Sequence, residues 1–253
     1  MTFFMTIRLN QFKKYLIVLT FGIIILSIFG INSGGDLHVF SSEESPRALM
    51  KGNEENSEVA LTFNITWGDE VLEPILQQLE NEDVTATFFL LGEWAEHHPH
   101  LVDLIDEKGH EIGMLGYRYK SYLKQDIEEV TKDLYKAKDI FTKLNYPDLT
   151  LLRTPSGHLN TKVLTTAISQ GFKVIDWGVN PNDWETPGVN AIVDDVMSKT
   201  DNGDIILMHA SDSAVQTAEA LEIILPGLKE KGLEFVTVSE LITQAEIKTE
   251  EIE

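Results

Sequence analysis

The chain has 253 residues, a formal net charge of −21 and no cysteine. This length suits one large α/β domain or two small ones, with room for a sizeable core. The absence of cysteine excludes a disulfide framework, a thiolate metal site and a cysteine nucleophile. The acidic balance argues against nucleic acid as a partner, because a phosphate backbone requires a basic protein face.

The N-terminal part of the chain differs from the rest in charge. Residues 1–14 include Arg8, Lys13 and Lys14 and no acidic residue, and residues 15–35 carry no charge at all. About 20 apolar residues are enough for a helix to cross a bilayer. We therefore predict a signal-anchor transmembrane helix at 15–35 that follows a cytoplasmic basic N-terminus. A cleaved signal peptide is the alternative, and either one places the body outside the cytoplasm.

Two polar segments flank the predicted body of the protein. Residues 36–57 contain serines, a proline and a glycine, which is typical of a linker. Residues 243–253 are rich in glutamate, and we expect an acidic, solvated tail. The folded domain is therefore predicted to span residues 58–242.

Within that domain, strand-like and helix-like runs alternate. The clearest helix lies at 125–144, where the apolar residues fall on one face. Such alternation indicates right-handed βαβ units and a parallel sheet. We predict an α/β fold, a deformed (β/α)7 barrel of the TIM type that lacks one unit, with an open doubly wound sheet as the alternative. In both folds the site lies at the carboxyl ends of the strands. Short apolar runs predict seven strands, at 58–64, 84–91, 110–115, 150–153, 172–177, 204–209 and 233–236.

Polar and aromatic side chains follow several of these strands. Taken singly, a histidine at a strand end is more often a packed residue than a catalyst. A structural ion pair is the corresponding alternative for Arg153 and Asp183. Convergence at one rim favours a functional site. Trp67, Tyr117 and Tyr119 could offer flat faces to a ligand, with packing as the alternative for each. The residues at the strand ends are Asn64, Ile65, Thr66 and Asp69, then Leu115, Tyr117 and Tyr119, then Arg153 to His158, then Asn180, Asn182, Asp183 and Trp184, and finally His209, Ser211, Asp212 and Ser213.

Five motifs occur in a fixed order along residues 58–242, namely TFNITWGDE, GHEIG, RTPSG, NDW and LMH. Their order resembles the NodB homology domain of the polysaccharide deacetylases, carbohydrate esterase family 4. The finer pattern, with one N-terminal membrane segment, is similar to the PdaB-type sporulation deacetylase-like proteins. The resemblance implies a reaction that hydrolyses the acetamide C–N bond of an N-acetylated cell-wall or spore glycan.

The resemblance also implies a mechanism. Family enzymes hold a divalent metal such as zinc with one aspartate and two histidines, and the metal polarises the acetyl carbonyl and supplies the attacking water. A second aspartate, held by an arginine, is the general base. A histidine tuned by another aspartate protonates the leaving amine. The backbone N–H that follows the proline of an R-x-P motif helps to bind the oxyanion.

Carried over to this sequence, the family pattern is incomplete. Asn64 stands at the base position, and Ile65, Leu115 and Tyr119 stand at the three metal positions. Isoleucine and leucine have no lone pair, and a catalytic metal needs three firm protein ligands. We therefore expect no metal, and the alternative is compensation by Asp69 and Glu70, which lie one loop away. The resemblance assigns catalytic-type positions to His209, Asp183, Arg153 and Asn64, and substrate-binding positions to Trp184, Leu207, Ser156, Pro155 and Asp69.

Three functions remain open from the sequence. The first is a weak or rebuilt deacetylase of cell-wall or spore N-acetyl sugars. The second is a non-catalytic protein that binds glycan or a partner at the membrane surface, and the third is a structural role. The expected partners are cell-wall or spore-cortex glycan and the membrane, through the N-terminal helix. The expected location is the cell membrane, with the domain outside the cytoplasm or in the forespore envelope.

Overall fold

The computed structural model describes residues 48–243. The predictions for the signal-anchor helix at 15–35, the N-terminus before it and nearly all of the acidic tail lie outside the described residues. Between residues 48 and 243, no helix combines the length and the apolar character that a membrane span requires.

The described chain contains seven strands, one in each predicted run. They are β1 (Glu58–Ile65), β2 (Thr87–Leu90), β3 (Glu111–Met114), β4 (Leu151–Leu152), β5 (Lys173–Val174), β6 (Ile205–His209) and β7 (Glu234–Phe235). Most are shorter than the apolar runs that predict them. The alternation of strands with helices is therefore confirmed, but the apolar pattern overestimates the length of most strands.

All of the strands pair in parallel, in the order β5-β4-β3-β2-β1-β6, with β7 against the start of β1. Beyond β5, a single bridge between Val179 and Ile206 links the chain to β6. The predicted α/β parallel architecture is confirmed. The sheet is a half-barrel, however, and not a ring of paired strands, because β4 and β5 are each only two residues long and do not carry the pairing around.

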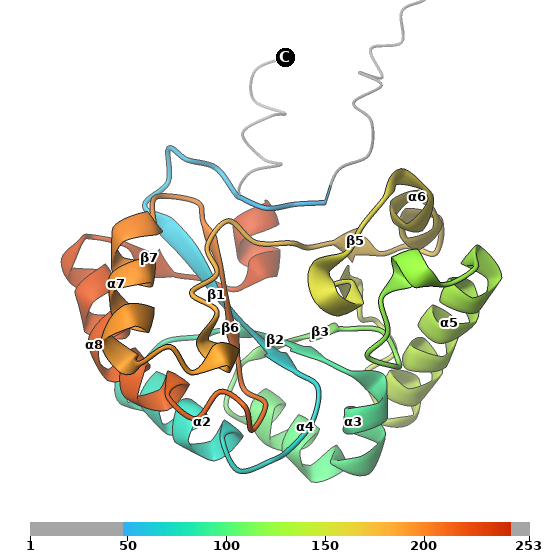
Figure 1. Ribbon diagram of the computed structural model, residues 1–253, viewed down its shortest axis with the longest axis horizontal. Helices are drawn as coiled ribbons and strands as arrows, with labels where there is room; N and C mark the ends of the chain where they lie inside the picture. The colour runs from blue at the N-terminus through green and yellow to red at the C-terminus, as the bar shows by residue number, and fades with distance from the viewer. Residues whose placement is uncertain (1–47, 244–253) are drawn as a thin grey trace, which may run out of the picture. The chain divides into compact units, whose positions relative to one another are not determined.

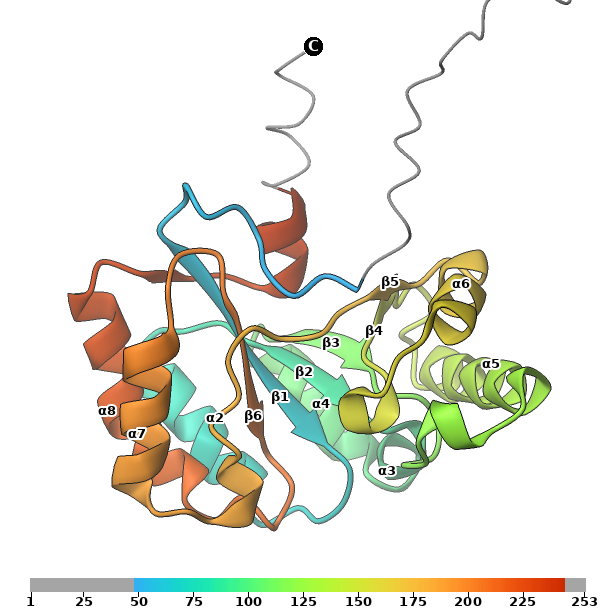
Figure 2. The same cartoon turned by 45° about the horizontal axis from the view of Figure 1, so that its top comes forward.

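Helices cover the outer face of this sheet, with α2, α7 and α8 over one part and α3 to α6 over the other (Figures 1 and 2). Helix α5 matches the predicted helix at 125–144 and buries Val130, Leu134 and Ala137. Its apolar stripe faces the sheet because residues three and four apart share one face. The helices are α2 (Leu72–Asn81), α3 (Gly92–His97), α4 (Pro99–Glu107), α5 (Ile127–Lys143), α6 (Thr161–Ser169), α7 (Val189–Lys199) and α8 (Thr217–Glu230).

The segment before β1 is bound to the domain from residue 48 onward. The Leu49 N–H donates to the Val174 carbonyl at 2.8 Å, and the Leu49 carbonyl accepts from the Asp176 N–H at 2.8 Å. The Gly52 N–H donates to the Gly203 carbonyl at 2.8 Å. The described end of the predicted 36–57 linker thus adds to the edge of the sheet beside β5.

Strand β1 places alternate side chains on opposite faces, as the pleat of a strand requires. Phe63 and Ile65 belong to the hydrophobic core and are fully buried. Thr62 and Asn64 point to the other face, where they contact polar groups. In the register with β6, Asn64 lies opposite His209. The ends of these two strands therefore bring an amide and an imidazole side by side.

Candidate functional site

A pocket of about 500 Å³ lies at the carboxyl ends of β1 and β6. Four aromatic side chains border it: Trp67, Tyr119, Trp177 and Trp184. The other lining residues are amides, hydroxyl-bearing residues, a glycine, Leu207 and His209, and none is aspartate, glutamate, lysine or arginine. In a chain with a formal charge of −21, this lining is unusually neutral. Such a mixture of aromatic and amide groups is suited to an uncharged polar ligand.

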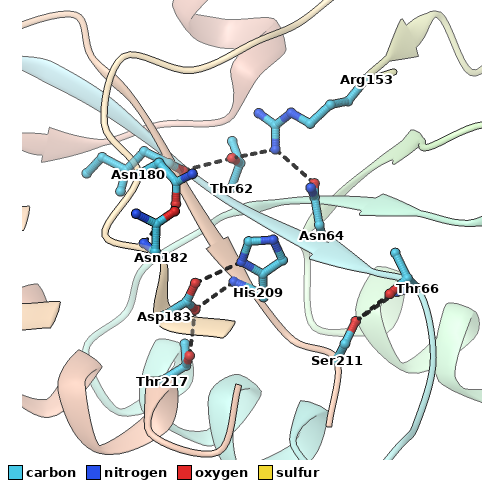
Figure 3. Close-up of polar contacts among 11 residues, drawn as sticks. Thr62, Asn64, Thr66, Arg153, Asn180, Asn182, Asp183, His209, Ser211 and Thr217 are labelled. Atoms are coloured by element: carbon cyan, nitrogen blue, oxygen red, sulfur yellow. Dashed lines mark hydrogen bonds and ion pairs between the residues drawn. The ribbon is translucent and has the colours of Figure 1, made fainter. Parts of the chain in front are cut away.

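Arg153 lies directly behind the floor of this pocket and is fully buried. One terminal nitrogen, Nη1, donates to Thr62 Oγ1 and to Asn64 Oδ1, each at 3.0 Å, as Figure 3 shows. Nη2 donates to the backbone carbonyl of Asp176 at 3.2 Å. The guanidinium carbon lies 4.1 Å from the centre of the Phe89 ring. A buried cation is thus held by neutral oxygens and an aromatic face.

No carboxylate of the described chain forms an ion pair with this guanidinium. Burial lowers the pKa of Arg153 to about 9, and the negative charge of Asp176 opposes that decrease. Burial likewise raises the pKa of Asp176, and the positive charge of Arg153 opposes that increase. The alternative of a structural ion pair between Arg153 and Asp183 is wrong, because Asp183 pairs with His209 instead.

His209, Asp183 and Thr217 form a second polar cluster on the pocket wall (Figure 3). His209 Nδ1 lies 2.8 Å from Asp183 Oδ1, and the His209 backbone N–H donates to Asp183 Oδ2 at 2.8 Å. The Thr217 hydroxyl donates to the same Oδ2 at 2.6 Å. Asp183 is fully buried, so three donors replace the water it loses. This arrangement fixes the orientation of the imidazole ring.

Asn64 has a defined orientation for a chemical reason. Every nitrogen of a guanidinium is a donor, so the Asn64 atom that faces Arg153 must be the oxygen. The amide nitrogen then lies on the opposite branch of the side chain. An aspartate at this position would offer acceptors on both branches, whereas Asn64 offers a donor.

The positions that hold a metal in the family do not fit one here. Ile65 and Leu115 are fully buried in the hydrophobic core. Tyr119 is 56% exposed and borders the pocket as a rim aromatic. Asp69 is exposed on its loop and is not among the residues that line the pocket. Across residues 48–243, no three histidine, aspartate or glutamate side chains gather in a way that could hold a metal ion.

The predicted substrate-binding residues divide into two groups. Trp184, Leu207 and Ser156 line the pocket, while Pro155 is buried beside it. Ser156 has a φ of 64°, in the left-handed region, within the turn η2 (Pro155–Gly157). In the described chain its backbone N–H has no hydrogen-bond acceptor. Asp69 remains a prediction without support from the pocket lining.

The aromatic predictions also divide. Trp67 and Tyr119 line the pocket and are more than half exposed. Tyr117 is buried, its hydroxyl donates to Glu96 of α3 at 2.9 Å, and it does not line the pocket. The alternative of packing is therefore correct for Tyr117, while the other two rings are placed to contact a ligand.

Sequence reasoning missed three residues that support the site. Thr62 accepts from Arg153 and donates to the Ile206 carbonyl at 2.7 Å, and its place two residues before Asn64 was a signal for it. Thr217 lies at the start of α8, far along the chain from Asp183, and nothing in the local pattern marks it. Trp177 lies 5.5 Å from the Arg153 guanidinium, and its position at the end of a predicted strand was the available signal.

The loop after β1 is fixed from two directions. Asp212 Oδ1 accepts from the backbone N–H groups of Glu70, at 2.9 Å, and Val71, at 3.3 Å, just before α2. The Trp94 indole N–H donates to the Gly68 carbonyl at 2.7 Å. These bonds hold the loop that carries Trp67 over the pocket.

Comparison with known proteins agrees with the motifs. Residues 51–175 match the family model described as polysaccharide deacetylase. The chain is 35% identical over 187 residues to a peptidoglycan-N-acetylglucosamine deacetylase of Bacillus cereus. The matched region covers 73% of this chain and 87% of the relative. It is 32% identical over 202 residues to the uncharacterized protein YlxY of Bacillus subtilis, covering 80% of this chain but only 62% of YlxY, less than two thirds of its length.

A solved structure gives the same result. The fold matches that of BA3943, described as a CE4 family pseudoenzyme from Bacillus anthracis, with a TM-score of 0.73 and 30% identity over 78% of this chain and 69% of the other. These relatives support the family and do not single out the PdaB-type proteins. These matches, together with the pocket and its His209–Asp183 pair, show that the chain belongs to the polysaccharide deacetylase family.

Proposed function

We propose that this chain binds N-acetylated cell-wall glycan in the described pocket and does not hydrolyse its acetamide groups by the family mechanism. One observation carries the proposal. The pocket keeps the His209–Asp183 pair and a neutral, aromatic lining, whereas the metal positions hold Ile65, Leu115 and Tyr119. Binding requires only the groups that the pocket keeps. Hydrolysis by the family mechanism requires metal ligands, which Ile65, Leu115 and Tyr119 have replaced.

The loss of the base acts separately from the loss of the metal ligands. An aspartate beside a buried guanidinium would be ionised at neutral pH and ready to accept a proton. Asn64 keeps the hydrogen bond to Arg153 but has no comparable affinity for a proton. General-base assistance contributes typically about 10²–10⁴ in rate. His209 alone could protonate a leaving amine, but no remaining group would generate the nucleophile.

The relatives bear on both parts of the proposal, the binding of glycan and the loss of hydrolysis. The Bacillus cereus relative is named for the deacetylation of peptidoglycan N-acetylglucosamine, which points to glycan as the ligand class. BA3943 is described as a pseudoenzyme, and a mutant of it as having restored enzymatic activity. A second candidate for this chain, a weak deacetylase with a rebuilt site, is favoured by the intact His209–Asp183 pair.

The location and context of the protein are part of the proposal. We infer a single-pass anchor at residues 15–35, with the domain outside the cytoplasm, from the uncharged apolar run and the basic residues before it. We also infer a role in sporulation, supported by the likeness of the motifs to PdaB-type proteins. The ligand would then be peptidoglycan of the cell wall or the spore cortex.

Binding and turnover by the full-length chain test the proposal together. We expect N-acetylglucosamine tetramer to bind, and Trp184→Ala to weaken the binding by about two- to tenfold, since a stacked aromatic side chain contributes about 0.5–1.5 kcal/mol beyond the area it buries. Tyr135→Ala is the matched control, because Tyr135 is an exposed aromatic on α5 and does not line the pocket.

Acetate release from the same tetramer is measured with zinc, cobalt or manganese added. We expect none. Release that disappears in His209→Ala would support the weak deacetylase instead. Failure of the chain to bind the tetramer or peptidoglycan fragments would overturn the binding function and leave a structural role.

A further inference from the structure

We propose that a second cavity, at the amino ends of β3 and β4, binds a short aliphatic diamine. The cavity has a volume of about 240 Å³. Its lining comes from the end of α4, the loop between α5 and β4, the starts of both strands and Ser239. Because the strands are parallel, this cavity lies at the opposite end of the sheet from the glycan pocket. The proposal therefore does not depend on the proposed function.

The charged side chains that line the second cavity are all acidic. Asp106, Glu111 and Asp148 line it, and no lysine or arginine does. Lys108, two residues after Asp106, directs its charge to Glu80, with a 2.7 Å ion pair. The lining thus provides no positive charge that would balance its three carboxylates.

Tyr146 responds to this negative charge. It also lines the cavity, and its hydroxyl donates to Asp103 Oδ1 at 3.3 Å. Burial raises the pKa of Tyr146, and the negative charges of Asp106 and Asp103 add to that increase. The cavity is therefore a region of negative potential, which favours a cationic ligand.

His110 is the most buried polar side chain of the lining, at 6% exposed. Its Nδ1 atom is enclosed and has no hydrogen-bond partner in residues 48–243. Nε2 has no partner in that part of the chain either, but it is not among the enclosed atoms, so it reaches the surface. The surface that His110 contributes is the wall of this cavity. An unpaired imidazole nitrogen in such a place requires a partner from a ligand or from water.

The lining offers acceptors at two depths with apolar surface beside them. An ammonium has three donors and no acceptor, so it complements a carboxylate or the lone pair of a neutral imidazole. Burial, with the positive charge of Lys108, lowers the pKa of His110 to about 4, so the ring is neutral at pH 7. One ammonium would contact buried His110, and the other would contact the exposed carboxylates Asp106 and Asp148.

Apolar side chains complete the match to a diamine. Ile112, Leu149 and Leu151 line the same cavity and can cover the methylene groups that join the two ammonium ends. Glu111 is held in place, because its Oε2 accepts from the Thr87 hydroxyl at 2.7 Å and from a backbone N–H at 3.2 Å. Its other oxygen is left for the ligand.

A metal ion fits this cavity less well than a diamine. A metal requires its ligands to converge on one point. Across residues 48–243, no three histidine, aspartate or glutamate side chains do so. A diamine instead pairs with acceptors that are separated, and its length accounts for the separation.

Equilibrium dialysis of the full-length chain at neutral pH compares 1,4-diaminobutane with butylamine and with Mg²⁺. We expect the diamine to bind with a dissociation constant on the order of 1 mM, about tenfold tighter than butylamine, because only the diamine pairs at both ends. Asp148→Asn should weaken diamine binding by about two- to fivefold. Asp194→Asn removes the same charge from an exposed site on α7 outside the cavity and should change nothing.

His110→Phe keeps an aromatic ring and removes both nitrogens. We expect the preference for the diamine over butylamine to fall by about fivefold or more in this variant. An unchanged preference in the folded variant would overturn the role of His110. If the variant does not fold, the wild-type comparison and Asp148→Asn decide the question, because Asp148 is exposed.

Three other results would overturn the proposal. Equal affinity for the diamine and butylamine would exclude a site with two ends. Equal weakening by Asp148→Asn and Asp194→Asn would indicate only general attraction to a chain of formal charge −21. Displacement of the diamine by an equal concentration of Mg²⁺ would indicate a metal site instead. Competition between the diamine and N-acetylglucosamine tetramer would place the diamine in the glycan pocket, whereas independent binding of the two supports a separate site.

Discussion

His110 is the strongest candidate for an acid-sensitive element in this fold. The residue precedes β3, is 6% exposed and has its Nδ1 atom buried with no hydrogen-bond partner in residues 48–243. Burial lowers the pKa of His110 from 6.5 to about 4, and the positive charge of Lys108 adds to that decrease. The folded protein therefore binds fewer protons at this site than the unfolded chain does. Stability contributed by His110 is present above the unfolded pKa and is lost as the pH falls.

The size of this loss follows from the two pKa values. Between about pH 7.5 and about pH 5, the linkage relation gives a decrease of about 2 kcal/mol in the free energy of unfolding. The ring borders a second cavity of about 240 Å³, so solvent screening makes this an upper value. The perturbation is His110→Phe, which keeps a ring beside Phe88, 5.3 Å away between centres.

Urea unfolding at the two pH values measures the effect. We expect the decrease in the free energy of unfolding from the higher to the lower pH to be smaller in His110→Phe than in the wild-type chain, by about 1–2 kcal/mol. His100→Phe, at an exposed helical position, is the control and should keep the wild-type decrease. An identical pH dependence in wild type and His110→Phe would refute the reasoning, whatever the stability at the higher pH.

Three further predictions concern the site. In urea unfolding, Gly68→Ala should lower the free energy of unfolding by about 2 kcal/mol more than Gly109→Ala does. Both glycines have a φ near +80°, so the backbone strain is similar in the two variants. A Cβ at Gly68 would lie 2.1 Å from Asp212, whereas a Cβ at Gly109 would have no neighbouring atom within 4 Å. Thr217→Val should cost about 1–3 kcal/mol in the same assay, because it removes a donor from a fully buried carboxylate, while Thr217→Ser should cost less, and equal effects of the two would contradict this role. Asn64→Asp alone should release no acetate from N-acetylglucosamine oligomers with or without zinc, because the metal positions stay apolar, and any metal-dependent release would show that a cation site exists.

The fold was largely predictable from local patterns. Seven short apolar runs, and the stripe on the helix at 125–144, follow from burial of one side of each element against a sheet. Whether the strands close into a barrel could not be predicted, because it depends on how far the short strands β4 and β5 continue the pairing. That property arises from the packing of distant segments and leaves no local periodicity.

The site was predictable in part. Asn64, Leu207 and His209 converge on one pocket because they lie toward the carboxyl ends of the neighbouring parallel strands β1 and β6, and Trp184 joins them from the segment between β5 and β6. One alternative paired Asp183 with Arg153, whereas Asp183 contacts His209. The sequence could not decide between the two pairings, because it does not show which side chain lies nearer to Asp183. Thr217 was missed for a related reason, since its contact with Asp183 joins an η3 turn (Asp183–Glu185) to the start of α8.

The burial of Ile65 limits how catalysis could ever return to this chain. Its side chain is fully covered in the core, on the face of β1 opposite Asn64. A carboxylate placed there first would have no cation to neutralise it and would pay a desolvation penalty of several kcal/mol. The step at Ile65 therefore loses stability before any rate is gained, whereas a carboxylate at position 64 would face the Arg153 guanidinium. A metal site would need ligands at Ile65, Leu115 and Tyr119 together, because a catalytic metal requires three protein ligands.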